Sequence, residues 1–387
     1  PDFVRYYYYI FPFGLGLTLF TILEAYAWQL KKSILTNYLR EIQFRVFTTL
    51  LIVLTFAGLI TSFDLFIKLF SFTYLAIAAM LLASLVLGRH VSLTFSVSIV
   101  TRKFFRKIMH LISFVYGGNM VFTISIVFDT IIIAAVLPDG LALAGIYTLA
   151  QNIASLIQAP QRGVISSSIG PLSQAWKNKD LARINRIYHS SSINQLIFSV
   201  AMFALIWMNF NDAVLNFHLQ HRYLEAAMVF FYIGLMRIVD MGTGVNSQII
   251  VTSTFWRFDF ITGIILLALT LPLNYVFTKY YFGVTGPAIA NLISLTVYNL
   301  IRYWFLYARF AMQPFSLKTL YTLLLGIGGY VLSYYVFRDM HGFAGMILRS
   351  ALFVFVFVSG VKWLELSPDV KPVWQTMLKK LGIKKGD

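Results

Sequence analysis

The sequence contains no cysteine, and this absence excludes several kinds of chemistry. Without thiols the chain forms no disulfide, has no thiolate nucleophile and holds no metal through sulfur. Its six histidines, at positions 90, 110, 189, 218, 221 and 341, form no HExxH motif. We therefore predict no metal site.

Charged residues are also scarce, at 12% of the 387 residues, whereas soluble domains average about 25%. Hydrophobic residues make up 59%, and the mean hydropathy is +0.76. A chain with so little charge cannot cover a folded surface with polar side chains. The composition predicts an all-α, polytopic membrane helix bundle, because lipid offers backbone groups no hydrogen-bond partner.

The number of membrane crossings follows from apolar stretches of roughly 20 residues, the length that spans a bilayer core. The sequence predicts about eleven transmembrane helices. Their ranges are 6–28, 46–63, 68–87, 108–137, 141–170, 191–210, 223–252, 258–278, 285–308, 318–337 and 343–364.

The orientation follows from the positive-inside rule, which places Lys and Arg in cytoplasmic loops. One set of alternate loops, together with the tail, holds 22 of the 31 basic residues, and the other set holds five: Arg5, Lys68, Arg222, Lys279 and Arg338. This asymmetry predicts a cytoplasmic C-terminus. The N-terminus as given then lies outside, and loss of an odd number of helices before it would explain that arrangement.

The net charge of +16 raises the question of a nucleic-acid partner. Cytoplasmic loops facing anionic lipid account for it better, so we expect membrane lipids and no nucleic acid as partners. Two basic segments have apolar residues at helical spacing, 181–188 and the tail 367–387. We interpret the tail as a cytoplasmic amphipathic helix, either solvated or lying in the membrane interface.

Three predicted spans are longer than the bilayer requires and contain helix-breaking residues. These are Gly117-Gly118 in 108–137, Pro160 and Gly163 in 141–170, and Gly242 and Gly244 in 223–252. Interrupted helices indicate the binding site of a transporter. Glycines in membrane helices also allow close packing, which is the alternative interpretation.

Arginines inside spans are the candidate substrate-binding residues, since a buried charge normally faces a cavity or a partner. Arg162 lies between Pro160 and Gly163, and Arg237 lies near the middle of its span. Guanidinium groups suit a phosphate, which they bind through paired hydrogen bonds. The alternative for Arg237 is an ion pair with Asp240, three residues further along the same helix face.

Carboxylates inside spans are the candidate coupling-ion ligands. Asp129 and Asp240 each share a predicted span with an amide residue, Asn119 and Asn246 respectively. Carboxylate and amide oxygens can hold Na⁺ or relay a proton, although helix–helix hydrogen bonding is the alternative. We expect Arg302 and Arg349 to reach the membrane interfaces and to stand outside the site.

Three stretches resemble a known family. Residues 117–176, including GIYTLAQNIASLIQAPQRGVISSSIGPLSQAW, resemble the seventh and eighth helices of oligosaccharide flippases, the O-antigen and polysaccharide branch of the multidrug/oligosaccharidyl-lipid/polysaccharide exporter superfamily. RIVDMGTGVNSQIIVTSTFWRFDF at 237–260 is similar to the tenth helix and its following loop. YFGVTGPAIANLISLTVYNLIRYW at 281–304 is similar to the twelfth.

The resemblance implies a two-lobed transporter whose first lobe lacks about three helices. It divides the chain into a partial lobe at 1–88, a six-helix lobe at 107–311, an additional helix pair at 318–366 and the tail at 367–387. It implies a monomer in the bacterial inner membrane. Its function would be to move a polyprenyl-diphosphate-linked oligosaccharide, as in lipopolysaccharide synthesis, from the cytoplasmic to the outer leaflet by alternating access. The resemblance thus implies a transporter without a catalytic centre or a bound cofactor, and Na⁺ or H⁺ would be its coupling ion.

Three other functions compete with this interpretation. A cation-coupled multidrug antiporter of the same superfamily would need an acidic, aromatic cavity, which the span arginines disfavour. A membrane glycan polymerase or ligase needs a sizeable external loop, and the longest predicted here, at 211–222, is too short for a catalytic domain. A structural scaffold is the third possibility, and only a transport assay separates it from the flippase.

Overall fold

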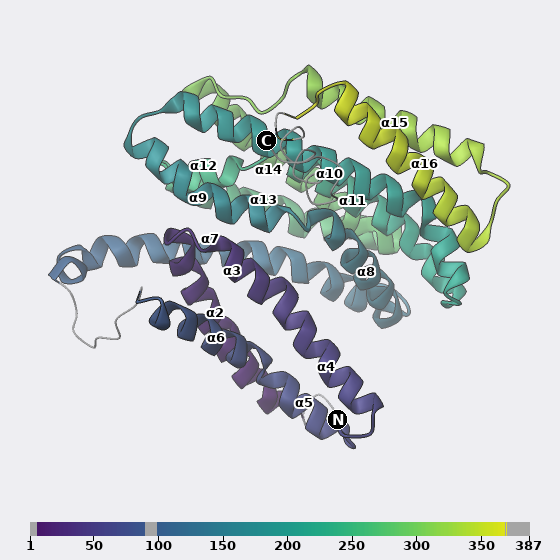
Figure 1. Ribbon diagram of the computed structural model, residues 1–387, viewed down its shortest axis with the longest axis horizontal. Coiled ribbons are helices and arrows are strands. Elements are labelled where there is room, and N and C mark those ends of the chain that lie inside the picture. Colours follow the sequence, from purple (N-terminus) through teal and green to yellow (C-terminus); the bar gives the residue numbers. More distant parts are fainter. Residues whose placement is uncertain (1–5, 90–98, 368, 370–387) are drawn as a thin grey trace, which may run out of the picture. The chain divides into compact units, whose positions relative to one another are not determined.

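The computed structural model of the chain describes residues 6–89, 99–367 and 369. Within these ranges every regular element is a helix and there is no strand, which confirms the all-α prediction (Figure 1). The elements are η1 (Tyr7–Tyr9), α2 (Ile10–Gln29), α3 (Ser33–Asn37), η2 (Tyr38–Gln43), α4 (Phe44–Phe56), α5 (Phe63–Ser71), α6 (Thr73–Leu87), α7 (Ile99–Val136), α8 (Gly140–Ser155), η3 (Leu156–Gln158), α9 (Gln161–Lys177), α10 (Leu181–Asn216), η4 (His221–Glu225), α11 (Ala226–Gly242), α12 (Asn246–Val251), α13 (Trp256–Val276), η5 (Phe277–Phe282), η6 (Gly283–Thr285), α14 (Gly286–Phe310), α15 (Leu317–Val336) and α16 (Gly342–Trp363).

Each predicted span overlaps one or more of these helices. Seven helical segments of the described chain are long and apolar enough to cross a membrane, and one of them, Trp256–Phe310, contains both α13 and α14. The predicted spans at 46–63, 108–137 and 223–252 fall on α4, α7 and α11, outside those seven segments. With 13 and 17 residues, α4 and α11 are shorter than a full crossing of roughly 20 residues.

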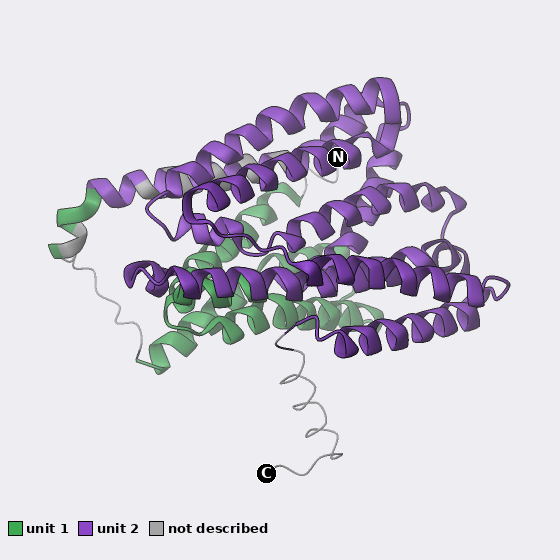
Figure 2. Cartoon of the chain, turned by 90° about the horizontal axis from the view of Figure 1, so that it is seen from above, with its two compact units in different colours: residues 1–105, 162–171 green, residues 106–161, 172–387 purple. Residues whose placement is uncertain are grey.

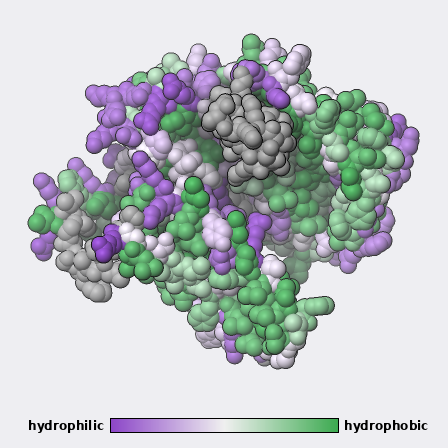
Figure 3. Space-filling model, viewed as in Figure 1, coloured by the Kyte–Doolittle hydropathy of each residue, from purple (hydrophilic) through white to green (hydrophobic). Residues whose placement is uncertain are grey.

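The helices expose large apolar side chains, such as Ile327 on α15 and Ile347 and Phe355 on α16. Hydrophobic residues cover much of the surface over α15 and α16, as Figure 3 shows. A water-soluble protein rarely exposes such continuous apolar area. The surface therefore suits a hydrocarbon environment.

The chain divides into two compact units, residues 1–105 with 162–171, and residues 106–161 with 172–387 (Figure 2). In the first unit α2 packs closely on α6, and a Cβ at Gly16 would overlap the backbone of Tyr74 and Leu75. Phe20, Ile77 and neighbouring residues form its core. Small residues permit such close approach between membrane helices. The predicted lobe boundaries stay predictions.

The second unit has two apolar clusters. In the larger one, α8, α10, α11, α13 and α14 bury residues such as Tyr147, Phe230 and Ile233. In the smaller one, α15 and α16 pack against α10 around Val200 and Phe353. The helices that carry most of the candidate site residues therefore belong to one well-packed body.

Helix ends follow local sequence signals. The side chain of Asp180 accepts a hydrogen bond from the backbone N–H of Arg183, at 2.9 Å, and caps α10. The basic segment 181–188, whose apolar residues recur at helical spacing, forms the first turns of α10. Nearly all of the predicted tail helix at 367–387 lies outside the described residues.

Two of the three predicted helix interruptions occur. Span 141–170 breaks into α8, η3 and α9 at Pro160, and span 223–252 breaks between α11 and α12, where Gly244 has a φ of +63°. Helix α7, in contrast, runs without interruption through Gly117-Gly118, so that prediction is wrong. A glycine weakens a helix by only about 1 kcal/mol, which neighbouring turns can offset.

Candidate functional site

The carboxylate of Asp129 on α7 is 1% exposed and lies among hydrogen-bond donors from three other helices. Its Oδ2 accepts from the hydroxyl of Tyr147 on α8 at 2.9 Å and from the Nδ2 of Asn291 on α14 at 2.6 Å. Its Oδ1 accepts from the Nδ2 of Asn274 on α13 at 2.7 Å. An ionised carboxylate is an acceptor only, so these donors suit its charged form. The sequence made Asp129 a candidate coupling-ion ligand, with helix–helix hydrogen bonding as the alternative.

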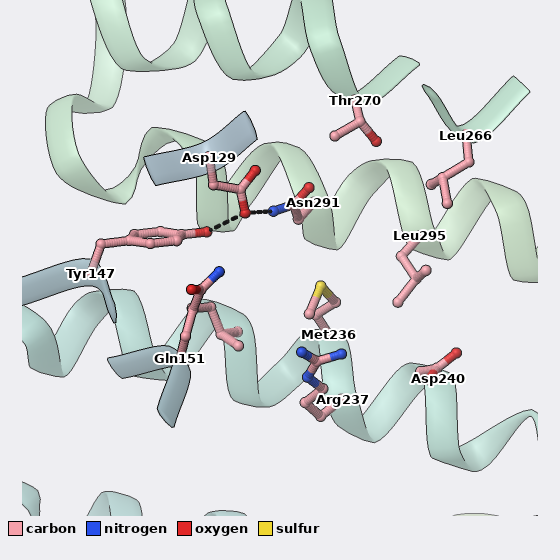
Figure 4. Close-up of a pocket in the computed structure, with 11 residues that line it drawn as sticks. Asp129, Tyr147, Gln151, Met236, Arg237, Asp240, Leu266, Thr270, Asn291 and Leu295 are labelled. Carbon is pink, nitrogen blue, oxygen red and sulfur yellow. Dashed lines mark hydrogen bonds between the residues drawn. The ribbon is translucent and has the colours of Figure 1, made fainter. Parts of the chain in front are cut away.

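A cavity of about 50 Å³ adjoins this cluster, within the second unit (Figure 4). Its lining combines charged, amide and apolar groups: Asp129, Tyr147, Gln151, Ile233, Met236, Arg237, Asp240, Leu266, Thr270, Asn291 and Leu295. That volume is enough for a few water molecules or one small ion. It is too small for a sugar.

Arg237 on α11 points into this cavity, beside Gln151 and Met236. Its guanidinium lies within 4 Å of no carboxylate in the described residues, and its buried Nε has no hydrogen-bond partner there. The alternative of an ion pair with Asp240 is therefore not what the structure shows. A buried guanidinium with spare donors is ready to bind an anion.

Asp240 lies one turn further along α11 and has other partners. Its Oδ2 accepts from the Nε2 of Gln161 at 2.9 Å, and its Oδ1 from the Nδ2 of Asn299 at 3.2 Å. The Oδ1 of Asn299 in turn accepts from the Nδ2 of Asn246 at 2.9 Å and from the hydroxyl of Thr243 at 3.2 Å. Asp240 and Asn246, predicted as ion ligands, are thus joined through Asn299. The network ties α14 to both interrupted helices.

Arg162, the other predicted substrate-binding residue, belongs to the first unit. It forms an ion pair with Glu41 of η2, and its side chain is 62% exposed. Glu41 also lies 3.6 Å from the guanidinium of Arg45. The residues that line the cavity of Arg237 do not include Arg162. The side chain of Asn119, the fourth predicted ion ligand, lies outside the described residues.

Arg302 and Arg349 do not reach the interfaces as predicted. Each is buried in the second unit and forms an ion pair, Arg302 with Asp259 and Arg349 with Asp212. Arg302 also stacks on the ring of Tyr298, 3.8 Å from its centroid. Their partners lie on other helices, which is why spacing along one helix did not reveal them.

Sequence reasoning also missed Tyr147, Asn274 and Asn291. A signal was present, because each is a polar side chain within an otherwise apolar span, and such residues normally have partners inside the bundle. No group of three or more His, Asp or Glu residues in the described part of the chain could hold a metal ion. The arrangement can hold a charge, exchange one small ion or proton, and bind an oxyanion at Arg237.

No protein-family model matches this chain, and no curated protein matches it. Among solved structures it is similar to a lipid II flippase, MurJ, in an inward closed conformation, with a TM-score of 0.61 and 13% sequence identity. The match covers 93% of this chain and 72% of that one. At this identity the likeness shows the fold alone: the chain has a polytopic helical fold similar to that of MurJ.

Proposed function

We propose that this protein is a flippase that moves a polyprenyl-diphosphate-linked oligosaccharide from the cytoplasmic to the outer leaflet. Transport rather than catalysis is its role, and the bacterial inner membrane is its location. The observation that carries the proposal is Arg237, a guanidinium inside the bundle that has no carboxylate within 4 Å among the described residues. The MurJ-like fold and the apolar exterior support it.

In this mechanism Arg237 binds the diphosphate while the lipid tail stays in the bilayer. A diphosphate-linked sugar does not fit a cavity of about 50 Å³, so contact requires a conformation in which α11 is opened to one side. Alternating access supplies such conformations by moving one half of a transporter against the other. The interruptions at Pro160 and Gly244 are the places where helices can bend.

We assign the coupling ion, Na⁺ or H⁺, to the Asp129 cluster. Its carboxylate stands beside two amides on different helices, so binding an ion there links α7, α13 and α14. Asp240 is the weaker candidate, because it lies one turn along α11 from Arg237, whose positive charge repels a cation. Entry of one cation down a potential of 100 mV supplies about 2.3 kcal/mol.

One observation favours a cation-coupled multidrug antiporter instead. The cavity has two carboxylates, Asp129 and Asp240, and one guanidinium, Arg237, so its formal charge is negative. Protein donors already satisfy both carboxylates, however, whereas Arg237 has donors to spare. This difference favours an anionic substrate.

The test is a flipping assay with the purified chain in lipid vesicles. The probe is a polyprenyl-diphosphate-linked disaccharide with a fluorophore on the sugar, and dithionite added outside destroys the fluorescence of exposed probe. Probe in the inner leaflet is protected from dithionite until it is flipped outward. We expect the chain to accelerate the loss of this protected fluorescence. Arg237→Gln should slow that loss at least tenfold, because charge-assisted hydrogen bonds contribute roughly 1.5–3 kcal/mol.

The matched control is Arg222→Gln, which removes an equal charge from an exposed loop pair with Asp139. Its rate should equal that of the unmodified chain. Equal rates for all three proteins would remove Arg237 from substrate binding. Gradient-driven uptake of a cationic dye, with no flipping of the probe, would favour the antiporter.

A further inference from the structure

A second cavity, of about 270 Å³, lies in the second unit between α10, α15 and α16. Its lining comes from the C-terminal part of α10, the last turns of α15, the following loop and the second turn of α16. The charge asymmetry of the loops places this end of the helices outside. The proposed flippase mechanism uses none of its residues.

The floor of this cavity is a buried ion pair between Arg349 on α16 and Asp212 on α10. The Arg349 side chain is 5% exposed, and its Nε donates to the carbonyl oxygen of Gly345 at 3.2 Å. Next to the pair, the Nδ2 of Asn209 donates to the hydroxyl of Ser350 at 2.9 Å. Arg349 lies about 10 Å along α16 from its start. A charge fixed that far inside a span indicates a built site rather than a solvated surface group.

Positive charge exceeds negative charge around this floor. Asp212 neutralises Arg349, and Arg338 in the loop after α15 adds a second guanidinium, with His341 beside it in the lining. Neither Arg338 nor His341 has a carboxylate within 4 Å among the residues that the structure describes. The available groups are mainly donors, which favours a ligand with anionic oxygens.

Aromatic rings form the wall of the cavity. Tyr330 and Tyr334 on α15 stack with centroids 5.9 Å apart and planes 13° apart, and both line the cavity together with Trp207 of α10. Each ring has a flat apolar face and a polar group at its edge. Aromatic walls with a few fixed polar groups are typical of small-molecule sites, whose volumes are roughly 300–1,000 Å³. This cavity is close to the lower end of that range.

We propose that this cavity binds an oxyanion, a phosphate or carboxylate, carried on a small hydroxylated carbon skeleton. Arg338 and the outward side of Arg349 bind the anion, and the tyrosine rings cover the skeleton. Two sources share this chemistry, an acidic sugar and the glycerol phosphate of a lipid headgroup. The site is independent of the proposed transport path, so a negative result for this site would not contradict the flippase function.

The test measures ligand-induced thermal stabilisation of the purified chain in detergent, at one ionic strength. The probes are glucuronate and glycerol 3-phosphate, and glucose and glycerol are their uncharged counterparts. A ligand that binds only the folded protein raises its Tm with concentration, which yields a Kd. We expect at least one charged probe to raise the Tm, and the uncharged counterparts to leave it unchanged.

Arg338→Gln is the decisive variant, because its exposed side chain can change without disturbing the buried pair. We expect it to raise the Kd of the charged probe about tenfold. Arg309→Gln removes an exposed guanidinium from the other end of the helices, one that also forms no ion pair within the described part of the chain. It should change the Kd less than twofold. Stabilisation by glucuronate alone identifies an acidic sugar, and stabilisation by glycerol 3-phosphate alone identifies a lipid headgroup.

Three outcomes would overturn the proposal. One is that no charged probe raises the Tm, and another is that the uncharged probes raise it equally. The third is that Arg338→Gln and Arg309→Gln shift the Kd alike, which would show general charge attraction. The flipping assay tests the proposed flippase function separately. If the Arg338→Gln protein still flips the probe in vesicles, that function stands whichever of these outcomes is found.

Discussion

The carboxylate of Asp129 receives hydrogen bonds from three side chains, and each donor comes from a different helix. This geometry determines what a neutral substitute does. An asparagine at 129 has one acceptor oxygen, and its NH₂ would face the donor groups of its neighbours. A buried donor without an acceptor costs roughly 1–3 kcal/mol.

We predict that Asp129→Asn removes the dependence of flipping on an ion gradient. In the vesicle assay with the unmodified chain, an inward gradient of the coupling ion should shift the distribution of the probe between the two leaflets. For one charge at 100 mV the shift is up to roughly fifty-fold. The variant should show no bias toward either leaflet with Na⁺ or H⁺ gradients. Its slow, gradient-independent flipping should remain.

Asp139→Asn is the control for this prediction, because Asp139 is exposed and forms an ion pair with the exposed Arg222, outside the cavity. It should keep the full gradient dependence. If Asp129→Asn keeps it as well, the three donors serve only to hold the helices together. A Tm measured for each variant separates lost coupling from lost folding.

At the scale of single residues, the sequence identified the charged side chains but not their partners. Asp129 and Arg237 were predicted as site residues, and both line the cavity. Glu41 and Asp259 were missed as partners, because an ion pair between distant helices leaves no spacing signal in one sequence. Arg302 was misjudged for the same reason, since its long side chain can reach an interface as readily as a buried carboxylate.

Among the helices, α15 and α10 approach each other at a glycine. A Cβ at Gly326 would overlap the Cγ1 of Val200 on α10, whereas a Cβ at Gly328 would meet nothing within 4 Å. Both glycines lie on α15, so substitution at either position raises helix propensity equally. The pair therefore isolates the effect of contact between the helices.

We predict that Gly326→Ala lowers the thermal stability of the chain in detergent and that Gly328→Ala does not. Overfilling a packed contact costs typically 1–3 kcal/mol, whereas alanine in place of an exposed helical glycine gains up to about 1 kcal/mol. The measurement is the Tm of each variant. A Gly326→Ala protein as stable as the Gly328→Ala protein would show that α15 does not dock on α10 in this way.

Helix interruptions were predicted from breaking residues, with mixed results. Pro160 and Gly244 do interrupt their spans, because proline has no backbone N–H to donate and Gly244 adopts a positive φ. The Gly117-Gly118 pair lies in an unbroken α7, since glycine permits a break without requiring one. Breaking residues therefore located the interruptions at Pro160 and Gly244, but they could not show which glycines adopt a non-helical conformation.

At the scale of the whole molecule, the fold class followed from hydropathy alone, because lipid restricts the backbone to hydrogen-bonded helices. The structural similarity to MurJ agrees with the polytopic fold that the sequence predicted. The second cavity could not be predicted, since its residues lie on α10 and on the pair α15 and α16, which are far from α10 in the sequence. Such sites depend on how helices associate, which span lengths and loop charges do not specify.

The orientation of the whole chain is tested with single cysteines, which this cysteine-free sequence makes straightforward. We predict that cysteines at Asp139 and Gln220 react with a membrane-impermeant maleimide added to intact cells. A cysteine at Lys179 should react only after permeabilisation, because basic loops stay on the cytoplasmic side. All three positions are exposed, so burial cannot explain a missing signal. Labelling of Lys179→Cys from outside would reverse the topology and place the second cavity on the cytoplasmic side of the membrane.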